Sequence, residues 1–217
     1  MTKGGEEGFY DRCLYYCETF NKVQITYRGR KESVKKFLGV VGSPRKKGNT
    51  HILVSKILEG AKKEGARREI LFLNDLEIRE CDGCLVCWKG KPCRKKDDMN
   101  RIYPKIIESD VIIFGTPVYW YGPTALMKGF IDRFVYFNCP ENRMKIRGKE
   151  AVLAVPFEEE SPETAAPLIT SFEKSLQYLE MNLVGKVIVP GVSRKGEILG
   201  KEDRLKEAFD LGRKLAK

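Results

Sequence analysis

The chain has 217 residues, enough for one domain with a full-sized core, and no apolar run approaches the roughly 20 residues that a transmembrane helix needs. It carries 40 basic and 30 acidic residues, a net charge of +10, but the basic residues are spread along the chain and match no nucleic-acid-binding motif. The first residues, MTKGGEEGFYDRC, include acidic residues and no apolar stretch. We therefore expect no signal peptide, no membrane or nucleic-acid partner, and a cytoplasmic location.

Residues 1–32 differ in pattern from the rest of the chain, and we interpret them as an N-terminal extension of unknown role. Cys13 and Cys17 stand four residues apart and could share one helix face, although small side chains that pack the extension are the interpretation we favour. Regular elements begin after this segment. The predicted domain is therefore 33–217.

In chain order, apolar runs and helical spacing predict a strand at 36–42, a helix at 49–65, a strand at 68–74, a helix at 97–110, a strand at 111–117, a helix at 124–137, a strand at 150–156, a helix at 161–180, a strand at 182–192 and a helix at 202–216. Asp97 or Asp98 is placed to cap the helix at 97–110, and Pro104 is expected to kink it.

The predicted strands are short and evenly apolar, which indicates a sheet covered on both faces and therefore parallel. Five strands that alternate with five helices are typical of the α/β class, with a flavodoxin-like doubly wound sheet of order 2-1-3-4-5 and helices on both faces. Ligands of such sheets bind beyond the carboxyl ends of strands 1 and 3. The loops after these two strands are therefore the candidate site.

The loop after the first strand, GSPRKKGNT at 42–50, is rich in hydrogen-bond donors. Side chains of Ser43, Arg45, Asn49 and Thr50, with backbone N–H groups at the start of a helix, favour a bound phosphate. The loop is not a P-loop, because Lys47 stands where that motif has its second glycine. An ordinary polar turn with an asparagine cap is the alternative.

The loop after the third strand, TPVYWYGPT at 116–124, has three aromatic residues between two prolines. A stiff backbone and large rings beside a phosphate site suit a planar ring ligand. Alternatively, Tyr119, Trp120 and Tyr121 pack the core or an oligomer interface.

A third motif, CDGCLVCWKGKPC at 81–93, has the spacing C-x2-C-x2-C-x5-C. This run resembles the cysteine run of ferredoxins and favours a [4Fe–4S] cluster with ligands Cys81, Cys84, Cys87 and Cys93. Zinc, or free and reactive thiols, are the alternatives. Because the motif follows the second strand, we expect it at the same sheet edge as the other two loops.

Basic residues surround the cysteine motif, namely Lys89, Lys91, Arg94, Lys95 and Lys96. They could offset the negative charge of a cluster and attract an acidic electron donor, or they could be a solvated surface.

These three motifs resemble those of the NADPH-dependent FMN reductase-like proteins, and the cysteine motif resembles that of the iron–sulfur flavoproteins. The resemblance covers roughly residues 36–217. The resemblance implies bound FMN and a homodimer or homotetramer. It implies an FMN phosphate on Ser43, Arg45, Gly48, Asn49 and Thr50. It implies a flavin ring against Pro117, Val118, Tyr119, Trp120 and Gly122. The extension at 1–32 departs from the family's pattern.

The prediction for function is an FMN-dependent oxidoreductase that receives electrons from a ferredoxin-like donor through the cluster. The flavin then reduces a small acceptor; the resemblance suggests dioxygen, peroxide or a quinone-like molecule. No side chain need act as acid or base, so no catalytic residue is named. One alternative is an NAD(P)H-dependent FMN or quinone reductase without a functional cluster. Another is a non-enzymatic binding module stabilised by zinc or a cluster.

Overall fold

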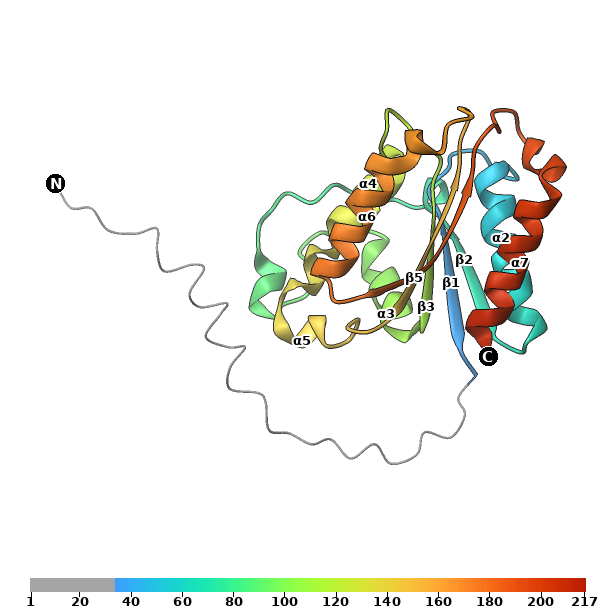
Figure 1. The fold of residues 1–217 in the computed structure, drawn as a ribbon. Helices are drawn as coiled ribbons and strands as arrows, with labels where there is room; N and C mark the ends of the chain where they lie inside the picture. Colours follow the sequence, from blue (N-terminus) through green and yellow to red (C-terminus); the bar gives the residue numbers. More distant parts are fainter. Residues whose placement is uncertain (1–33) are drawn as a thin grey trace. The chain divides into compact units, whose positions relative to one another are not determined.

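The computed structural model describes residues 34–217, so the predicted extension with Cys13 and Cys17 lies outside the described residues. The described chain forms a five-stranded sheet, all parallel, in the order β2-β1-β3-β4-β5 (Figure 1). The strands are β1 Lys36–Val41, β2 Arg67–Phe72, β3 Val111–Gly115, β4 Glu150–Pro156 and β5 Asn182–Val189. The predicted strand order and parallel sheet are confirmed.

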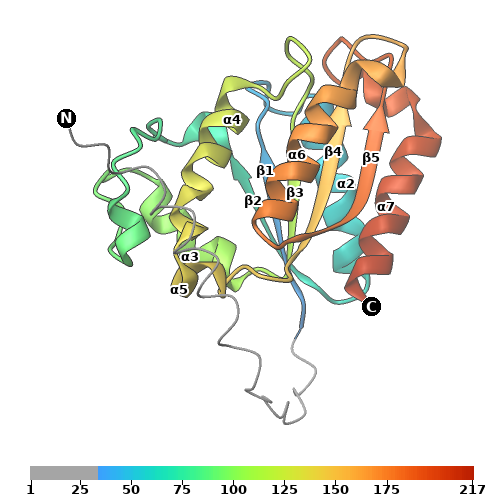
Figure 2. The ribbon, with the colours of Figure 1, turned by 60° about the vertical axis from the view of Figure 1, so that its left-hand side comes forward.

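Helices cover both faces of the sheet (Figures 1 and 2). They are α2 Asn49–Lys63, α3 Met99–Glu108, α4 Ala125–Asp132, α5 Pro140–Arg143, α6 Ala166–Tyr178 and α7 Glu202–Ala216. Residues of α2 and α7 pack with one set of buried strand side chains, and residues of α3, α4 and α6 pack with the alternate set. Because successive strand residues point to opposite faces, the evenly apolar strands supply both cores.

Several element ends differ from the sequence prediction. The helix expected at 124–137 ends at Asp132, and the chain continues as a 3₁₀ turn, Arg133–Asn138, where the Tyr103 hydroxyl donates to the Arg133 carbonyl at 3.2 Å. The strand expected at 182–192 ends at Val189, because Pro190 has no N–H for the ladder. The helix expected at 161–180 begins as a 3₁₀ turn and becomes α-helical at Ala166.

The parallel strands bring the loops after β1 and β3 to one sheet edge, where hydrogen bonds tie them together. The N–H of Gly42 donates to the Gly115 carbonyl at 2.7 Å. The hydroxyl of Thr124 donates to the Gly42 carbonyl at 2.6 Å. Both predicted loops therefore start from a fixed base. Within residues 34–217, no helix combines the length and apolar character needed to cross a bilayer.

Candidate functional site

A pocket with a cavity volume of about 120 Å³ lies at the carboxyl edge of the sheet. We call it the rim pocket. It brings together seven of the ten predicted FMN residues, namely Ser43, Arg45, Asn49, Thr50, Pro117, Val118 and Tyr119. Its other lining residues are Pro156, Phe157, Glu158, Val192 and Ser193, which follow or end β4 and β5. Sequence reasoning missed these because it inspected the loops after strands 1 and 3 only. The general rule that ligands bind at the carboxyl ends of strands could have found them.

Helix α2 opens onto the rim pocket without a side-chain cap. Gly48 is the residue before its first turn, in an extended conformation, and no side chain caps the helix. Asn49 instead turns to the loop after β5, donating to the Arg194 carbonyl at 2.9 Å and accepting from the Ile198 N–H at 3.3 Å. The alternative of an asparagine cap is therefore wrong. Backbone N–H groups at an uncapped helix start, with the helix dipole, favour an anion.

Arg45 also reaches across the rim pocket to the loop after β5. Its Nη1 donates to the Ser193 carbonyl at 2.9 Å. The Glu197 carboxylate fixes that loop by accepting from the N–H groups of Arg194 at 2.8 Å and Ser193 at 2.7 Å, and these bonds hold the pKa of Glu197 below its usual value. The guanidinium is thus held over the pocket by a backbone carbonyl. Its other N–H groups are left to donate to an anionic group.

The aromatic loop ends in a tight turn at the pocket mouth. Tyr119 and Gly122 exchange two backbone hydrogen bonds of 2.8 and 3.0 Å, and the two residues between them, Trp120 and Tyr121, have φ of 50° and 62°. Left-handed backbone costs roughly 1–2 kcal/mol at each such residue. Trp120 is 96% exposed, so the turn presents rings to solvent at this cost. Among the predicted flavin residues, Gly48, Trp120 and Gly122 flank the pocket and do not line it.

The four motif cysteines line a second pocket, which we call the thiol pocket. Its walls also include Leu85, Lys95, Tyr103, Arg133 and Tyr136. Within residues 34–217 the cysteines form no disulfide, and burial raises the pKa of the Cys87 thiol. No three His, Cys, Asp or Glu side chains of the described chain converge as around a single metal ion. Four cysteines that line one pocket are nevertheless the residue type that iron–sulfur clusters take as ligands.

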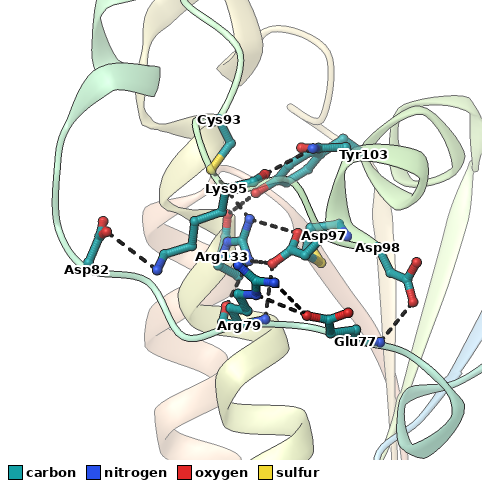
Figure 3. A network of polar contacts seen from close by, with 11 residues as sticks. Glu77, Arg79, Asp82, Cys93, Lys95, Asp97, Asp98, Tyr103 and Arg133 are labelled. Carbon is teal, nitrogen blue, oxygen red and sulfur yellow. Dashed lines mark hydrogen bonds and ion pairs between the residues drawn. The ribbon is translucent and has the colours of Figure 1, made fainter.

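The two ends of the cysteine loop are joined at a neck, which Figure 3 shows. The N–H of Glu77 donates to Asp98 at 2.8 Å, and the N–H of Asp98 returns a bond of 3.0 Å to the Glu77 carbonyl. The N–H of Arg79 donates to Asp97 at 3.0 Å. Asp97 also accepts from the N–H of Met99 at 3.1 Å, so it supplies the carboxylate at the start of α3. A loop closed in this way can hold four thiols on one wall.

A buried ion pair completes the neck. The Arg133 guanidinium binds the Asp97 carboxylate through its two terminal nitrogens, Nη1 and Nη2. The two side chains are 1% and 0% exposed. Burial is the largest single effect and opposes ionisation of Asp97, but the hydrogen bond and charge of Arg133, together with the N–H groups of Arg79 and Met99, outweigh it and keep the pKa of Asp97 below its usual value. Sequence reasoning assigned Asp97 to a helix cap only, and it gave Arg133 no role.

The predicted basic residues divide into two groups. Arg94 and Lys95 pair with Asp82 at 2.7 and 3.4 Å, and the hydrogen bond from Arg94 lowers the pKa of Asp82. Lys89, Lys91 and Lys96 are exposed around the loop. The exposed group forms a positive surface next to the thiol pocket.

The thiol pocket does not lie at the sheet edge with the other two loops, which corrects that expectation. It shares no lining residue with the rim pocket. Arg133, in the wall of the thiol pocket, directly follows the last residue of α4. The loop at 116–124 lies at the opposite end of this helix, before its first residue. The 3₁₀ turn Val86–Lys89 contacts the one that follows α4. From Thr124 to Arg133 the helical rise is roughly 14 Å at about 1.5 Å per residue.

Comparisons with known proteins place the chain in a family. The profile of the NADPH-dependent FMN reductase family matches residues 35–190. An iron-sulfur flavoprotein of Archaeoglobus fulgidus is 34% identical over 165 residues, which cover 76% of this chain and 81% of that protein. An NAD(P)H:quinone oxidoreductase from Methanothermobacter marburgensis has a TM-score of 0.68 at 19% identity, covering 84% of this chain and 96% of that chain.

A flavodoxin from the domain Archaea has a TM-score of 0.52 at 12% identity, covering 84% of this chain and 96% of that chain. At such identities these two structural likenesses bear on the fold alone. The family match and the sequence relative bear on function. The chain belongs to the NADPH-dependent FMN reductase family and, within it, to the iron–sulfur flavoproteins, and it is an FMN-dependent oxidoreductase.

Proposed function

We propose that this oxidoreductase passes electrons from a ferredoxin-like donor, through a [4Fe–4S] cluster on Cys81, Cys84, Cys87 and Cys93, to FMN and on to a small acceptor. The observation that carries the proposal is the thiol pocket, where the four cysteines of one short motif line the same space. When bound, the cluster would supply one-electron transfer, and the flavin could exchange one or two electrons.

In this proposal the rim pocket holds FMN. The start of α2 and the side chains of Ser43, Arg45, Asn49 and Thr50 bind the phosphate. The flavin ring lies against Pro117, Val118 and Tyr119, with Trp120 and Gly122 in the same turn and Gly48 at the helix start. Phe157 and Val192 add apolar walls that the sequence did not predict.

Hydrogen-bond donors and shape at the thiol pocket support the cluster. Lys95 and Arg133 bring N–H donors to the wall, each paired with a carboxylate, and Tyr136 supplies an aromatic side chain. Three residues in left-handed backbone, Gly83, Leu85 and Gly90, turn the loop back on itself, which lets Cys93 face the earlier cysteines.

The basic surface supports an acidic donor, since Lys89, Lys91 and Lys96 are exposed beside the loop. The family description favours a second candidate, an NAD(P)H-dependent FMN or quinone reductase without a functional cluster.

We also propose that residues 33–217 form the FMN-binding domain, that 1–32 is an extension, and that the protein is cytoplasmic. Tyr119, Trp120 and Tyr121 are exposed together, which supports assembly into a homodimer or homotetramer through the aromatic turn.

One anaerobic experiment separates the candidates. The purified, reconstituted protein is analysed for iron, sulfide and FMN, and its spectrum is recorded before and after addition of reduced ferredoxin or NADPH. The proposal expects about four irons, a brown protein, and flavin reduction by ferredoxin. An iron-free yellow protein that oxidises NADPH at steady state would establish the reductase alternative. A colourless protein would favour a binding module.

A further inference from the structure

Arg133 contacts three parts of the cysteine loop at once (Figure 3). Its Nη2 donates to Sγ of Cys93 at 3.4 Å, and its Nη1 donates to the Arg79 carbonyl at 2.8 Å. Both nitrogens also bind Asp97. One buried side chain therefore reaches the chain before the first cysteine, the last cysteine itself, and the chain after it.

A purely structural role accounts for only part of this arrangement. Closing the loop needs the bonds to Arg79 and Asp97, and those alone would satisfy much of the guanidinium. Burying an ion pair also has a desolvation cost that apolar residues of similar volume avoid. The N–H that faces the Cys93 sulfur is the contact that loop closure does not require.

We propose that Arg133 is a positioning residue that acts through Cys93 and raises the reduction potential of the cluster. This inference rests on the proposed function, because it needs a cluster ligated by Cys93. One-electron reduction adds negative charge to the cluster and its ligand sulfurs. The Arg133 N–H that lies 3.4 Å from the Cys93 sulfur stabilises that reduced form more than the oxidised form. The charge of Arg133 is balanced by that of Asp97, so the effect comes from the hydrogen bond, and burial of both side chains keeps water from competing for it.

Two variants test the role of Arg133. Arg133→Gln combined with Asp97→Asn removes both charges, so that no buried carboxylate is left unpaired. Arg133→Lys keeps a charge but loses the planar fork that reaches Cys93 and Asp97 together. Each protein is reconstituted, its iron is measured, and its cluster is titrated with dithionite under EPR detection. The double variant should show about a tenfold lower ratio of reduced to oxidised cluster at fixed potential, about 59 mV for one electron. Arg133→Lys should shift in the same direction by less.

The matched control is Arg94→Gln. Arg94 adjoins Cys93 in sequence and pairs with Asp82, but its side chain is 60% exposed. Removing this solvated charge leaves Asp82 paired with Lys95 and partly exposed, so the cluster potential should shift by much less than in the Arg133 variants. Unchanged potentials in both Arg133 variants, or an equal shift in Arg94→Gln, would overturn the inference. These two results differ from the failure of the proposed function, which would appear as a parent protein that holds no iron after reconstitution.

A second measurement needs no change at Arg133, so it serves even where those variants do not fold. In the Arg94→Gln protein with arginine labelled by ¹⁵N, pulsed EPR of the reduced cluster should detect a weakly coupled nitrogen from the bond to Cys93. Absence of that coupling in an iron-loaded sample would overturn the inference.

Discussion

The backbone N–H of Lys47 donates to Nδ1 of His51 at 3.1 Å. This bond lies in the loop at 42–50, where Lys47 has left-handed backbone with φ of 56°. His51 is the single histidine of the chain, and its ring packs edge-on against Phe72. A protonated Nδ1 cannot accept this bond, so the charge of His51 is linked to the loop.

The first prediction concerns this pH dependence. Burial, and then the charge of Lys47, lower the pKa of His51 from its usual 6.5. Because the folded pKa lies below the unfolded one, the stabilisation is present above about pH 6.5 and is lost as the pH falls through the folded pKa. An NMR titration of the one imidazole should give a midpoint below 6.5, and FMN should bind more weakly over the same range. A midpoint at or above 6.5 would contradict the bond.

A second prediction concerns the packing of α2 on α7, which lie side by side in Figures 1 and 2. A Cβ at Gly60 would lie 1.9 Å from the Phe209 carbonyl oxygen, and one at Gly212 would lie 1.9 Å from that of Ile57. Gly60→Ala should therefore destabilise the protein by about 1–3 kcal/mol, because the helices must separate. Urea unfolding gives the free energy.

The control for that prediction is Gly129→Ala in α4, where an added Cβ meets no atom within 4 Å. Alanine is favoured over glycine in a helix by about 1 kcal/mol, so this variant should be as stable as the parent or more so. Equal effects of the two substitutions would show that backbone preference, not helix contact, dominates at Gly60.

The sequence predicted the sheet order because strand and helix periodicities differ and parallel connections follow few topologies. The predicted ends of helices and strands were wrong where these ends depend on tertiary contacts. The last turns expected for helix 124–137 are a 3₁₀ segment, where Tyr103 binds the Arg133 carbonyl. Pro190 was visible in the sequence and could have ended β5 earlier.

At the candidate site, motif residues close in sequence were predicted, and partners distant in sequence were not. Ser193 meets Arg45 across 148 positions, and Arg133 meets Cys93 across 40. No local pattern encodes such pairs. The expected position of the cysteine loop was wrong because the rule for strand ends fixes where a loop starts, not where a long loop travels.

Arg45→Ala should weaken FMN binding by about 1–3 kcal/mol if the guanidinium binds the phosphate. Titration of the apoprotein gives the dissociation constant. Lys46→Ala is the matched control, since Lys46 pairs with Asp75 at 2.8 Å outside the rim pocket. Riboflavin, which lacks the phosphate, should bind weakly to the parent and be insensitive to Arg45. A dissociation constant for FMN that does not change in Arg45→Ala would remove this residue from the site.

Reduction by a ferredoxin-like donor should slow steeply with rising salt, because the exposed lysines of the cysteine loop attract it. Lys89→Glu with Lys91→Glu should lower the second-order rate at low salt by about tenfold or more. The control is Lys206→Glu on α7, where the side chain is 79% exposed. It makes the protein less positive at a place outside the cysteine loop and should have little effect on this rate. A stopped-flow rate that stays flat between low and high ionic strength would count against donor docking here.

The last prediction concerns the entry point for electrons. Cys87 is the buried, central cysteine of the thiol pocket. Cys87→Ala leaves three thiols, so the iron and sulfide content should fall sharply. FMN should stay bound, because the rim pocket shares no lining residue with the thiol pocket. The variant should be yellow, with its flavin reducible by light or dithionite and hardly by reduced ferredoxin.

Cys139→Ala is the control for Cys87→Ala, since Cys139 is also buried but does not line the thiol pocket. It should keep the parent's iron and its rate with ferredoxin. If Cys87→Ala lost its iron and still accepted electrons from ferredoxin at the parent rate, the thiol pocket would not be the entry point, and direct reduction of the flavin would replace the proposed route. If FMN left together with the iron, the two pockets would depend on each other through the neck, since the bonds of Asp97 and Arg133 join the cysteine loop to α3 and to the end of α4.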